Sequence, residues 1–375
     1  MVNDLIVCAE VENRMPDSKV SEGWTGPGRR DALIEPLQLS DDGLHIEMGK
    51  RGMAEWWYFD AHLDSGHTLV VFFYASNPNP GREGKIGVEI VLVRPDGKRV
   101  QTFVPYDRVQ FSAARDKPEV TIGANTLRVE QGAGGLPIYK IDVKEKALSC
   151  RLTYRAEVNG WKPGTGLSQF GGMGYFGWVI PFARASVEGT VSVGDMTMPV
   201  TGIGYHDHNW LNFPFQSIIR YWMWGRIYSE RHTVAYAFIQ CNEKVDNHAI
   251  KVLMLADGKD VVLSSGEFDF LMDDFENTPK AKYSFPKHIT IHAPAALHAS
   301  LRVSRILEAQ DMLENYHPLL RFLAKHVLRL QPGYFRLASA FELDVTQDTG
   351  SVVETGTTLH EIVLFKPAQR QQEPA

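Results

Sequence analysis

The densest group of chemically versatile side chains lies at residues 205–210, where the sequence reads YHDHNW. In an extended strand, alternate side chains point to opposite faces, so Tyr205, Asp207 and Asn209 are expected to share one face. The other face then carries the remaining residues, His206, His208 and Trp210. A polar junction held together by hydrogen bonds is the structural alternative to a reactive site.

An acid within an aromatic enclosure is the chemistry that this run predicts best. An apolar pocket around Asp207 raises the pKa of its carboxyl group, which keeps it protonated for donation near neutral pH. Tryptophan and tyrosine faces stabilise a nearby cation. A protonated acid beside such aromatic faces therefore suits protonation of a carbon–carbon double bond. His206 or His208 is expected to tune the acid or orient water, with Tyr205 beside it. Glu55 is a second candidate acid.

A metal centre is the competing interpretation, because a His-x-His pair on one face of a strand commonly supplies two ligands. Asp207 could be the third ligand only if the strand bends. Four other residues are further candidates for that ligand: Glu55, His62, His67 and His232. Since no spacing fixes a third ligand, we predict neither a metal nor a cofactor.

Aromatic strands supply the predicted walls of the substrate pocket. The residues assigned to substrate binding are Trp56, Trp57, Tyr58, Trp210, Tyr221, Trp222 and Trp224. Aromatic residues at strand spacing often simply fill a core, and that alternative stays open for each of them.

The elements that must position these residues are short strands in a repeated order. Alternation begins at residues 55–63 and places Trp57 and Phe59 on one face. Strands are predicted at 68–74 and 86–94, before a turn at Asp96-Gly97-Lys98. The same order returns in a second set, at residues 221–228, 233–239, 249–255 and Asp257-Gly258-Lys259. Such a repeat predicts two copies of one meandering β unit, as in barrels or sandwiches.

One segment has helical rather than strand periodicity. Residues 305–330 place Leu319, Leu323 and Val327 on one stripe and Arg321 and Lys325 on another. The prediction is a helical insertion that covers one end of a barrel. A lid, or a helix that contacts a membrane surface through residues 319–330, is the alternative.

Length and composition set the outer limits. The chain has 375 residues, which suits two domains, and we predict an arm at 1–50 followed by lipocalin-like domains at 51–215 and 216–375. A formal charge of -6 without a basic stripe argues against a nucleic-acid partner. The three cysteines are far apart, so a disulfide framework is not expected. No signal peptide or membrane-length apolar run is present, so the expected location is the cytoplasm.

Two motifs resemble the signatures of the hydroxyneurosporene synthase family, the carotenoid 1,2-hydratase-like group. They are EWWYFD at 55–60 and GYHDHNW at 204–210, approached by the runs at 178–181, 187–190 and 200–202. The resemblance implies two lipocalin-like β domains and the addition of water to a terminal isoprene double bond without a redox cofactor. It assigns the acid role to Asp207 and supporting roles to Tyr205, His206 and His208. Leu211 stands where the family usually has Gly, which puts a carotenoid substrate in question.

The sequence therefore predicts an all-β, mainly antiparallel protein and a cofactor-independent enzyme for an olefinic, mostly apolar small molecule. Acid-assisted hydration, cyclisation or isomerisation is the predicted reaction class. Fungal proteins with the same implied architecture of two lipocalin-like domains are similar to pericyclases. A Diels–Alderase-type cyclase is therefore an alternative function. A non-catalytic lipid or pigment carrier is the third possibility, since barrels commonly hold one apolar ligand.

Overall fold

A computed structural model describes residues 19–79, 81–277, 284–311, 313, 333–347 and 350–365 of the chain. These residues form strands and a few single-turn 3-10 helices, and they contain no α-helix. The all-β prediction is therefore confirmed. Across the same ranges, no helix has the length and apolar character needed to cross a bilayer.

The first sheet has twelve antiparallel strands, which follow one another in the order β4-β3-β2-β1-β12-β11-β9-β8-β7-β6-β5, with β10 on β11. Their bounds are β1 Ala54–Leu63, β2 Thr68–Ser76, β3 Ile86–Val93, β4 Arg99–Tyr106, β5 Phe111–Ala113, β6 Val120–Ile122, β7 Asn125–Gln131, β8 Pro137–Val143, β9 Leu148–Ala156, β10 Leu167–Gln169, β11 Tyr175–Val193 and β12 Met196–Leu211.

The second sheet has nine strands in the order β16-β15-β14-β13-β21-β20-β19-β18-β17. Their bounds are β13 Ile219–Tyr228, β14 His232–Cys241, β15 Ala249–Asp257, β16 Asp260–Ser265, β17 Asp269–Asn277, β18 Ser284–Ala293, β19 Leu297–Asp311, β20 Gly333–Gln347 and β21 Gly350–Leu364. The 3-10 turns are η1 Leu39–Asp42, η2 Arg108–Gln110, η3 Ala133–Gly135, η4 Gly171–Met173, η5 Phe215–Ser217 and η6 Glu243–Val245.

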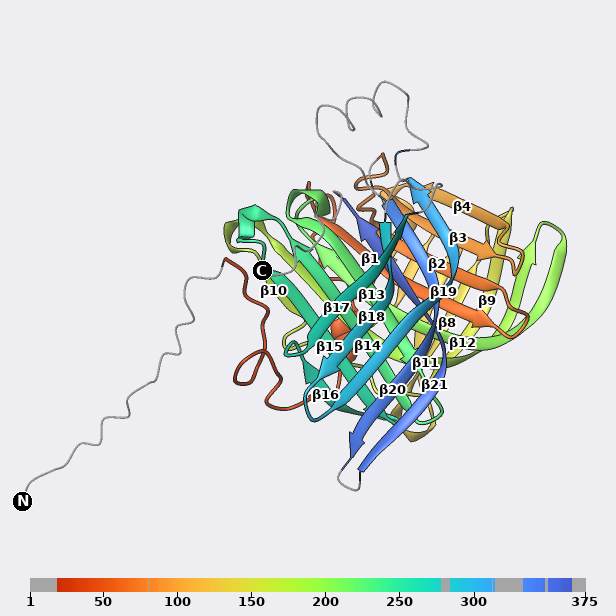
Figure 1. The fold of residues 1–375 in the computed structure, drawn as a ribbon. Helices are drawn as coiled ribbons and strands as arrows, with labels where there is room; N and C mark the ends of the chain where they lie inside the picture. Colours follow the sequence, from red (N-terminus) through yellow and green to blue (C-terminus); the bar gives the residue numbers. More distant parts are fainter. Residues whose placement is uncertain are drawn as a thin grey trace, which may run out of the picture.

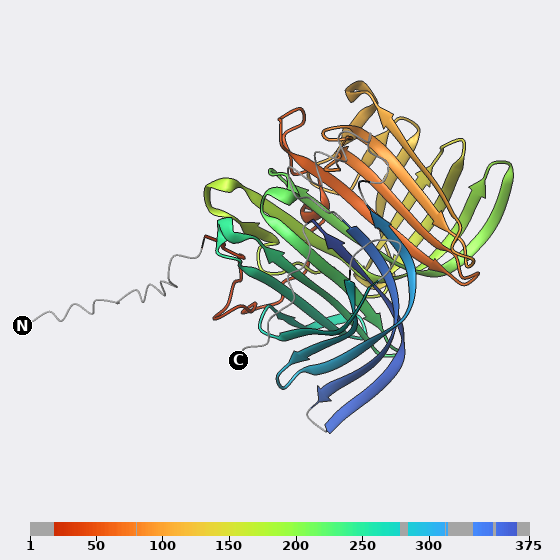
Figure 2. The ribbon, with the colours of Figure 1, turned by 45° about the horizontal axis from the view of Figure 1, so that its top comes forward.

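The two sheets share one connectivity, as the internal repeat predicted. In each, the first strand lies between the second strand and the last, so β1 pairs with β2 and β12, and β13 pairs with β14 and β21. Both sheets curl on themselves and pack side by side (Figures 1 and 2). This is the architecture of two lipocalin-like β domains. The sheets span residues 54–211 and 219–364, while the domain boundaries at 50 and 215 stay predictions.

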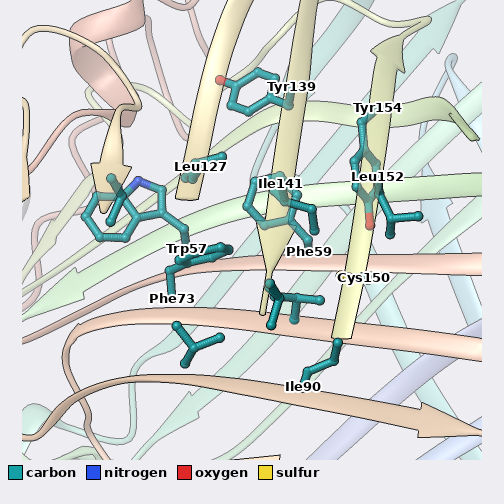
Figure 3. Packing of buried hydrophobic residues seen from close by; sticks show 14 of the residues in the cluster. Trp57, Phe59, Phe73, Ile90, Leu127, Tyr139, Ile141, Cys150, Leu152 and Tyr154 are labelled. Atoms are coloured by element: carbon teal, nitrogen blue, oxygen red, sulfur yellow. The ribbon is translucent and has the colours of Figure 1, made fainter. Parts of the chain in front are cut away.

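Each curled sheet encloses its own core. Aromatic and branched side chains fill the first one, among them Trp57, Phe59, Tyr139 and Tyr154 (Figure 3). The second core contains Met223 and Phe335, among others. A third apolar cluster lies between the sheets, where the outer faces of β1–β3, β11 and β12 meet those of β13–β15. Because side chains alternate along a strand, the same strands serve both a core and this interface.

The prediction of a helical insertion at residues 305–330 is wrong for its first part. Residues 305–311 belong to strand β19, which pairs with β20 as far as Asp311↔Gly333. Ile306 and Ala309 pack against the second core, and the ladder of backbone hydrogen bonds outweighs the helical pattern of the side chains. The rest of the segment, including the stripe at 319–330 and its suggested membrane contact, lies outside the described residues.

The predicted arm joins both sheets instead of standing free of them. Ser21 forms a β-bridge with Gln169 beside the first sheet, and Arg30 forms another with Ser265 in the second. Farther along, the η1 turn carries Asp42 to a buried position against the first core.

Candidate active site

The 205–210 run lies on β12, between β1 and β11. The predicted alternation is confirmed, and all six side chains are buried. Tyr205 joins the cluster between the sheets, whereas Trp210 packs in the first core. The motif therefore contributes to two separate environments, one on each face of a single strand.

Asp207 lies on the face between the sheets and accepts three hydrogen bonds. Trp178 Nε1 donates to its Oδ2 at 3.1 Å, and the Tyr205 hydroxyl donates to the same oxygen at 3.0 Å. Asn209 Nδ2 donates to Oδ1 at 2.8 Å. Within the described ranges, no lysine or arginine forms an ion pair with this carboxyl group. The side chain is thus held by neutral donors in an aromatic setting.

Burial dominates the electrostatics of this acid. Removal from water raises the pKa of Asp207 to about 6, although the Trp178 donor, the charge of His206 and the other two donors act in the opposite direction. The predicted direction of the shift is confirmed. A carboxyl group with this pKa changes its protonation state close to neutral pH, which is the condition for both giving and taking a proton.

A pocket adjoins Asp207 through Trp178. It is a small hollow between the sheets that is partly open to solvent, and its lining side chains are mostly apolar. Phe176 and Trp178 come from the first sheet, Ile239 and Val252 from the second, and Trp24 from the arm. Because Trp178 both lines this pocket and bonds Asp207, the pocket and the acid share a wall.

The histidines on the opposite face of β12 belong to a buried ionic cluster. Asp42 Oδ2 accepts a hydrogen bond of 2.7 Å from Tyr139 and lies 3.1 Å from His206 Nε2. Asp42 Oδ1 lies 3.1 Å from His208 Nδ1, as a close ionic contact without hydrogen-bond alignment. His208 Nε2 lies 2.9 Å from Glu55 Oε1. The cluster ties the arm to the interior of the first sheet.

Charge pairing controls protonation in this cluster. The carboxylates of Asp42 and Glu55 raise the pKa of His208 to about 9 despite its burial, which by itself acts to lower that pKa. The neighbouring histidines hold the pKa of Asp42 well below its usual range, again against burial. Glu55 also accepts the backbone N–H groups of His45 and Ile46, at 2.8 Å each. These contacts are those of a structural lock on the arm.

This arrangement places three candidate residues on the face of β12 opposite Asp207. His206 and His208 point away from Asp207 and do not contact it, although the charge of His206 acts through the strand to lower the pKa of the acid. Glu55 contacts His208 and the arm, on the side of β12 that faces away from the pocket beside Trp178. Of the five residues predicted as catalytic, the structure brings Asp207 together with Tyr205 on one face of β12 and His208 together with Glu55 on the other.

The aromatic candidates divide among three places. Those between the sheets are Trp56, Tyr58, Trp222 and Trp224. Trp57 and Trp210 fill the first core, where Trp57 stacks on His208, and Tyr221 fills the second core. Only the first group lies on the same side of the sheets as Asp207, and its part in substrate binding remains a prediction.

Of the residues considered as metal ligands, Glu55 contacts His208, whereas His62 and His232 lie elsewhere. His232 pairs with Glu354, and His62 lies beside Thr68 on β2. In the portion of the chain that the structure describes, no group of three or more His, Cys, Asp or Glu side chains is arranged to hold a metal ion.

Sequence reasoning missed several members of the site. Trp178 was noted only as part of a family-like run, and Asp42 was read as part of a polar arm. The buried pair of Asp60 with Arg226, at 2.6 and 2.7 Å, was also missed. Asp60 does follow the alternation that places Tyr58 on the same face, so strand periodicity was the available signal.

Comparisons with curated proteins give two relatives at 24% identity. One is the quinolone epoxide rearrangement protein asqO of Emericella nidulans, matched over 205 residues, 46% of this chain and 50% of that protein. The other is the hydroxyneurosporene dehydrogenase of Chlorobaculum tepidum, matched over 249 residues, 56% of this chain and 62% of that protein. The chain thus spans between half and two thirds of the length of these relatives.

Solved structures extend the similarity of fold. CghA superposes with a TM-score of 0.59 at 14% identity, covering 95% of this chain and 100% of that one. A putative AttH from Nitrosomonas europaea superposes with a TM-score of 0.58 at 14% sequence identity, covering 88% of this chain and 96% of that one. Kievitone hydratase from Nectria haematococca superposes with a TM-score of 0.53 at 12% sequence identity, covering 92% of this chain and 98% of that one. At these identities the likeness establishes the shared double-sheet fold.

The motifs at 55–60 and 204–210 both lie inside the region matched by a family model, and the resemblance inferred from them is confirmed. Since the AttH-like model matches residues 41–319, which is most of the chain, this protein belongs to the AttH-like family.

Proposed function

We propose that this protein is an enzyme that acts on an olefinic, mostly apolar small molecule bound between the two sheets, with Asp207 as the acid. The observation that carries the proposal is the buried Asp207 carboxyl group, hydrogen-bonded to Trp178 of the adjoining pocket, and burial raises the pKa of this group to about 6. Largely apolar pockets with a few convergent polar groups are the usual form of small-molecule sites.

The proposed reaction begins with transfer of the Asp207 proton to one carbon of the double bond. The π electrons form the new C–H bond, and the positive charge on the second carbon is stabilised by the faces of Trp178 and its aromatic neighbours. In a hydration, water adds to that carbon, and the resulting oxonium ion returns a proton to the Asp207 carboxylate. Acid and aromatic wall are therefore restored at the end of each cycle.

The names of the relatives support this reaction class in outline. One structural neighbour is a hydratase, and one curated relative is a protein of quinolone epoxide rearrangement. Both names describe chemistry on small organic molecules. Because the chain matches only 50% of the latter protein, its substrate does not carry over to this chain.

A pericyclase is the second candidate, and the three donors on Asp207 favour it. Those hydrogen bonds stabilise the carboxylate, and a carboxylate accepts hydrogen bonds but does not give protons. In that case the pocket holds one reactive conformer of a polyene, and catalysis arises from orientation. A carrier, the third candidate, would release its ligand unchanged.

Incubation of the purified protein with candidate polyenes in heavy-oxygen water distinguishes these candidates. Hydration places one ¹⁸O atom in the product, whereas cyclisation or rearrangement gives an unlabelled isomer, and both are read by mass spectrometry. Recovery of every polyene unchanged, despite measurable binding, would reject the enzyme and leave the carrier.

A further inference from the structure

A second pocket between the sheets lies away from the one beside Trp178, and it has a different chemical character. It is a small hollow that is partly open to solvent and has room for a single small polar group. Its lining combines charged and polar side chains with two apolar ones: Asp60, His62, Thr68, Arg226, Arg336, Glu361, Trp224 and Leu359. None of the catalytic residues proposed above lines it.

Arg336 has an unused donor at this pocket. Its Nε and Nη2 atoms both donate to Glu361 Oε1, at 2.9 and 2.6 Å. Its Nη1 atom is buried and has no hydrogen-bond partner among the described residues. The side chain is only 8% exposed. Trp224 Nε1, in the same pocket, is a second buried donor without an aligned hydrogen bond. Buried donors normally find acceptors, so unpaired ones indicate a missing partner.

The charges around the pocket cancel. Arg226 forms a bidentate pair with Asp60, and Arg336 pairs with Glu361. Burial, reinforced by the charge of Arg226, lowers the pKa of His62 to about 4, so this imidazole is neutral at pH 7. A buried carboxylate ligand would add an uncompensated negative charge. An uncharged oxygen could accept a hydrogen bond from Arg336 Nη1 without burying an additional charge.

We propose that this pocket binds a neutral carbonyl or amide oxygen at one end of the substrate, with Arg336 Nη1 as the donor. The inference rests on the proposed function, because it assigns the polar end of the molecule whose olefin reacts at Asp207. Arg226 and Trp224 connect the two places, since both contact the ring of Tyr205, which bonds Asp207.

The strand register gives the span that such a substrate must bridge. Asp207 is opposite Tyr58 on β1, and His62 is four residues farther along that strand. At about 3.4 Å per residue, the backbone positions of Tyr58 and His62 are roughly 14 Å apart, and Asp60, which also lines the pocket, lies halfway between them. The substrate class is therefore an elongated olefin with a neutral oxygen function roughly 7–14 Å from the reacting double bond.

Equilibrium binding of three matched fluorescent probes tests the assignment. The probes are cis-parinaric acid methyl ester, the parent carboxylic acid, and a conjugated tetraene hydrocarbon of the same length. Each is titrated against the full-length protein at pH 7 and against Arg336→Lys, which keeps the charge opposite Glu361 but lacks the guanidinium fork. Arg231→Lys is the control, because that arginine forms an exposed pair with Asp257.

The ester should bind about tenfold more tightly than the hydrocarbon, as expected for one hydrogen bond to a charged donor. Arg336→Lys should remove this preference without weakening hydrocarbon binding, and Arg231→Lys should retain it. Equal affinity of ester and hydrocarbon for the unmodified protein overturns the assignment, whether or not the variant folds. So does a carboxylate that binds more tightly than the ester, or an ester that does not bind. None of these results depends on turnover, so the role of Asp207 is judged separately.

Discussion

The Nε1 atom of Trp178 donates a 3.1 Å hydrogen bond to Oδ2 of Asp207, and the ring of Trp178 forms part of the adjoining pocket. One side chain therefore sets both the protonation of the proposed acid and the shape of the space beside it. The donor stabilises the carboxylate, while burial stabilises the protonated acid. The balance between the two effects makes the acid sensitive to any change at position 178.

Substitution of Trp178 by Phe should move the pH dependence of turnover to higher pH. If the protonated acid is the active form, the rate is constant below the Asp207 pKa of about 6 and falls as pH rises above it. Loss of the indole donor raises that pKa further, so the inflection in a pH–rate profile shifts upward. Trp24→Phe, in the same pocket but bonded to Glu22, should leave the inflection in place. A downward shift in Trp178→Phe would contradict this account of the acid.

The Asp207→Asn variant should separate catalysis from binding. Asparagine retains the size of the side chain but has no acidic proton, so turnover of a hydrated substrate should fall by a factor of about 10² to 10⁴. The dissociation constant of the ligand, measured by tryptophan quenching, should change by less than about threefold, a difference below 1 kcal/mol. Asp246→Asn, at an exposed position, is the control for turnover. A variant that keeps most of its rate would instead favour the pericyclase.

Loss of the Asp42 charge should destabilise the protein strongly. Asp42→Asn leaves His208 with Glu55 as its one carboxylate partner among the residues that the structure describes, in a fully buried cluster. Removal of one member of such an ion pair costs about 3–5 kcal/mol. The free energy of unfolding is measured by urea titration. The exposed pair of Lys19 with Asp246 supplies the comparison, since Asp246→Asn should cost less than about 1 kcal/mol. Equal effects of the two substitutions would show that the buried cluster does not lock the arm.

The stability of the protein should fall as the solution becomes alkaline. The pKa of His208 rises from 6.5 to about 9 on folding, so its contribution is complete below pH 6.5 and disappears as pH increases through 9. Asp42, with a lowered pKa, acts in the opposite sense and loses its contribution as pH falls below 3.8. Thermal unfolding between pH 6 and 10 tests the first statement. His208→Gln should show a flatter decline over this range, and an unchanged slope would refute the assignment.

The sequence by itself determined the elements and their order. Alternation at 55–63 and 205–210, with turns at Asp96-Gly97 and Asp257-Gly258, was enough for strands β1–β3, β12 and β13–β15 and for two copies of one meander. It also placed Asp207 and the two histidines on opposite faces of a strand. These are local properties, because side-chain direction in a strand repeats every two residues.

Only the tertiary structure decided what each face contacts. Asp42 reaches His206 across 164 positions of the sequence, and Arg226 reaches Asp60 across 166. Nothing local marks such pairs, because they arise when two curled sheets and an arm pack together. Because of the same packing, residues 305–311 form the end of strand β19, although their sequence has helical periodicity. Which face of β12 meets the second sheet, and hence which of its acids and histidines lies near a pocket, follows from long-range burial and not from the order of the residues.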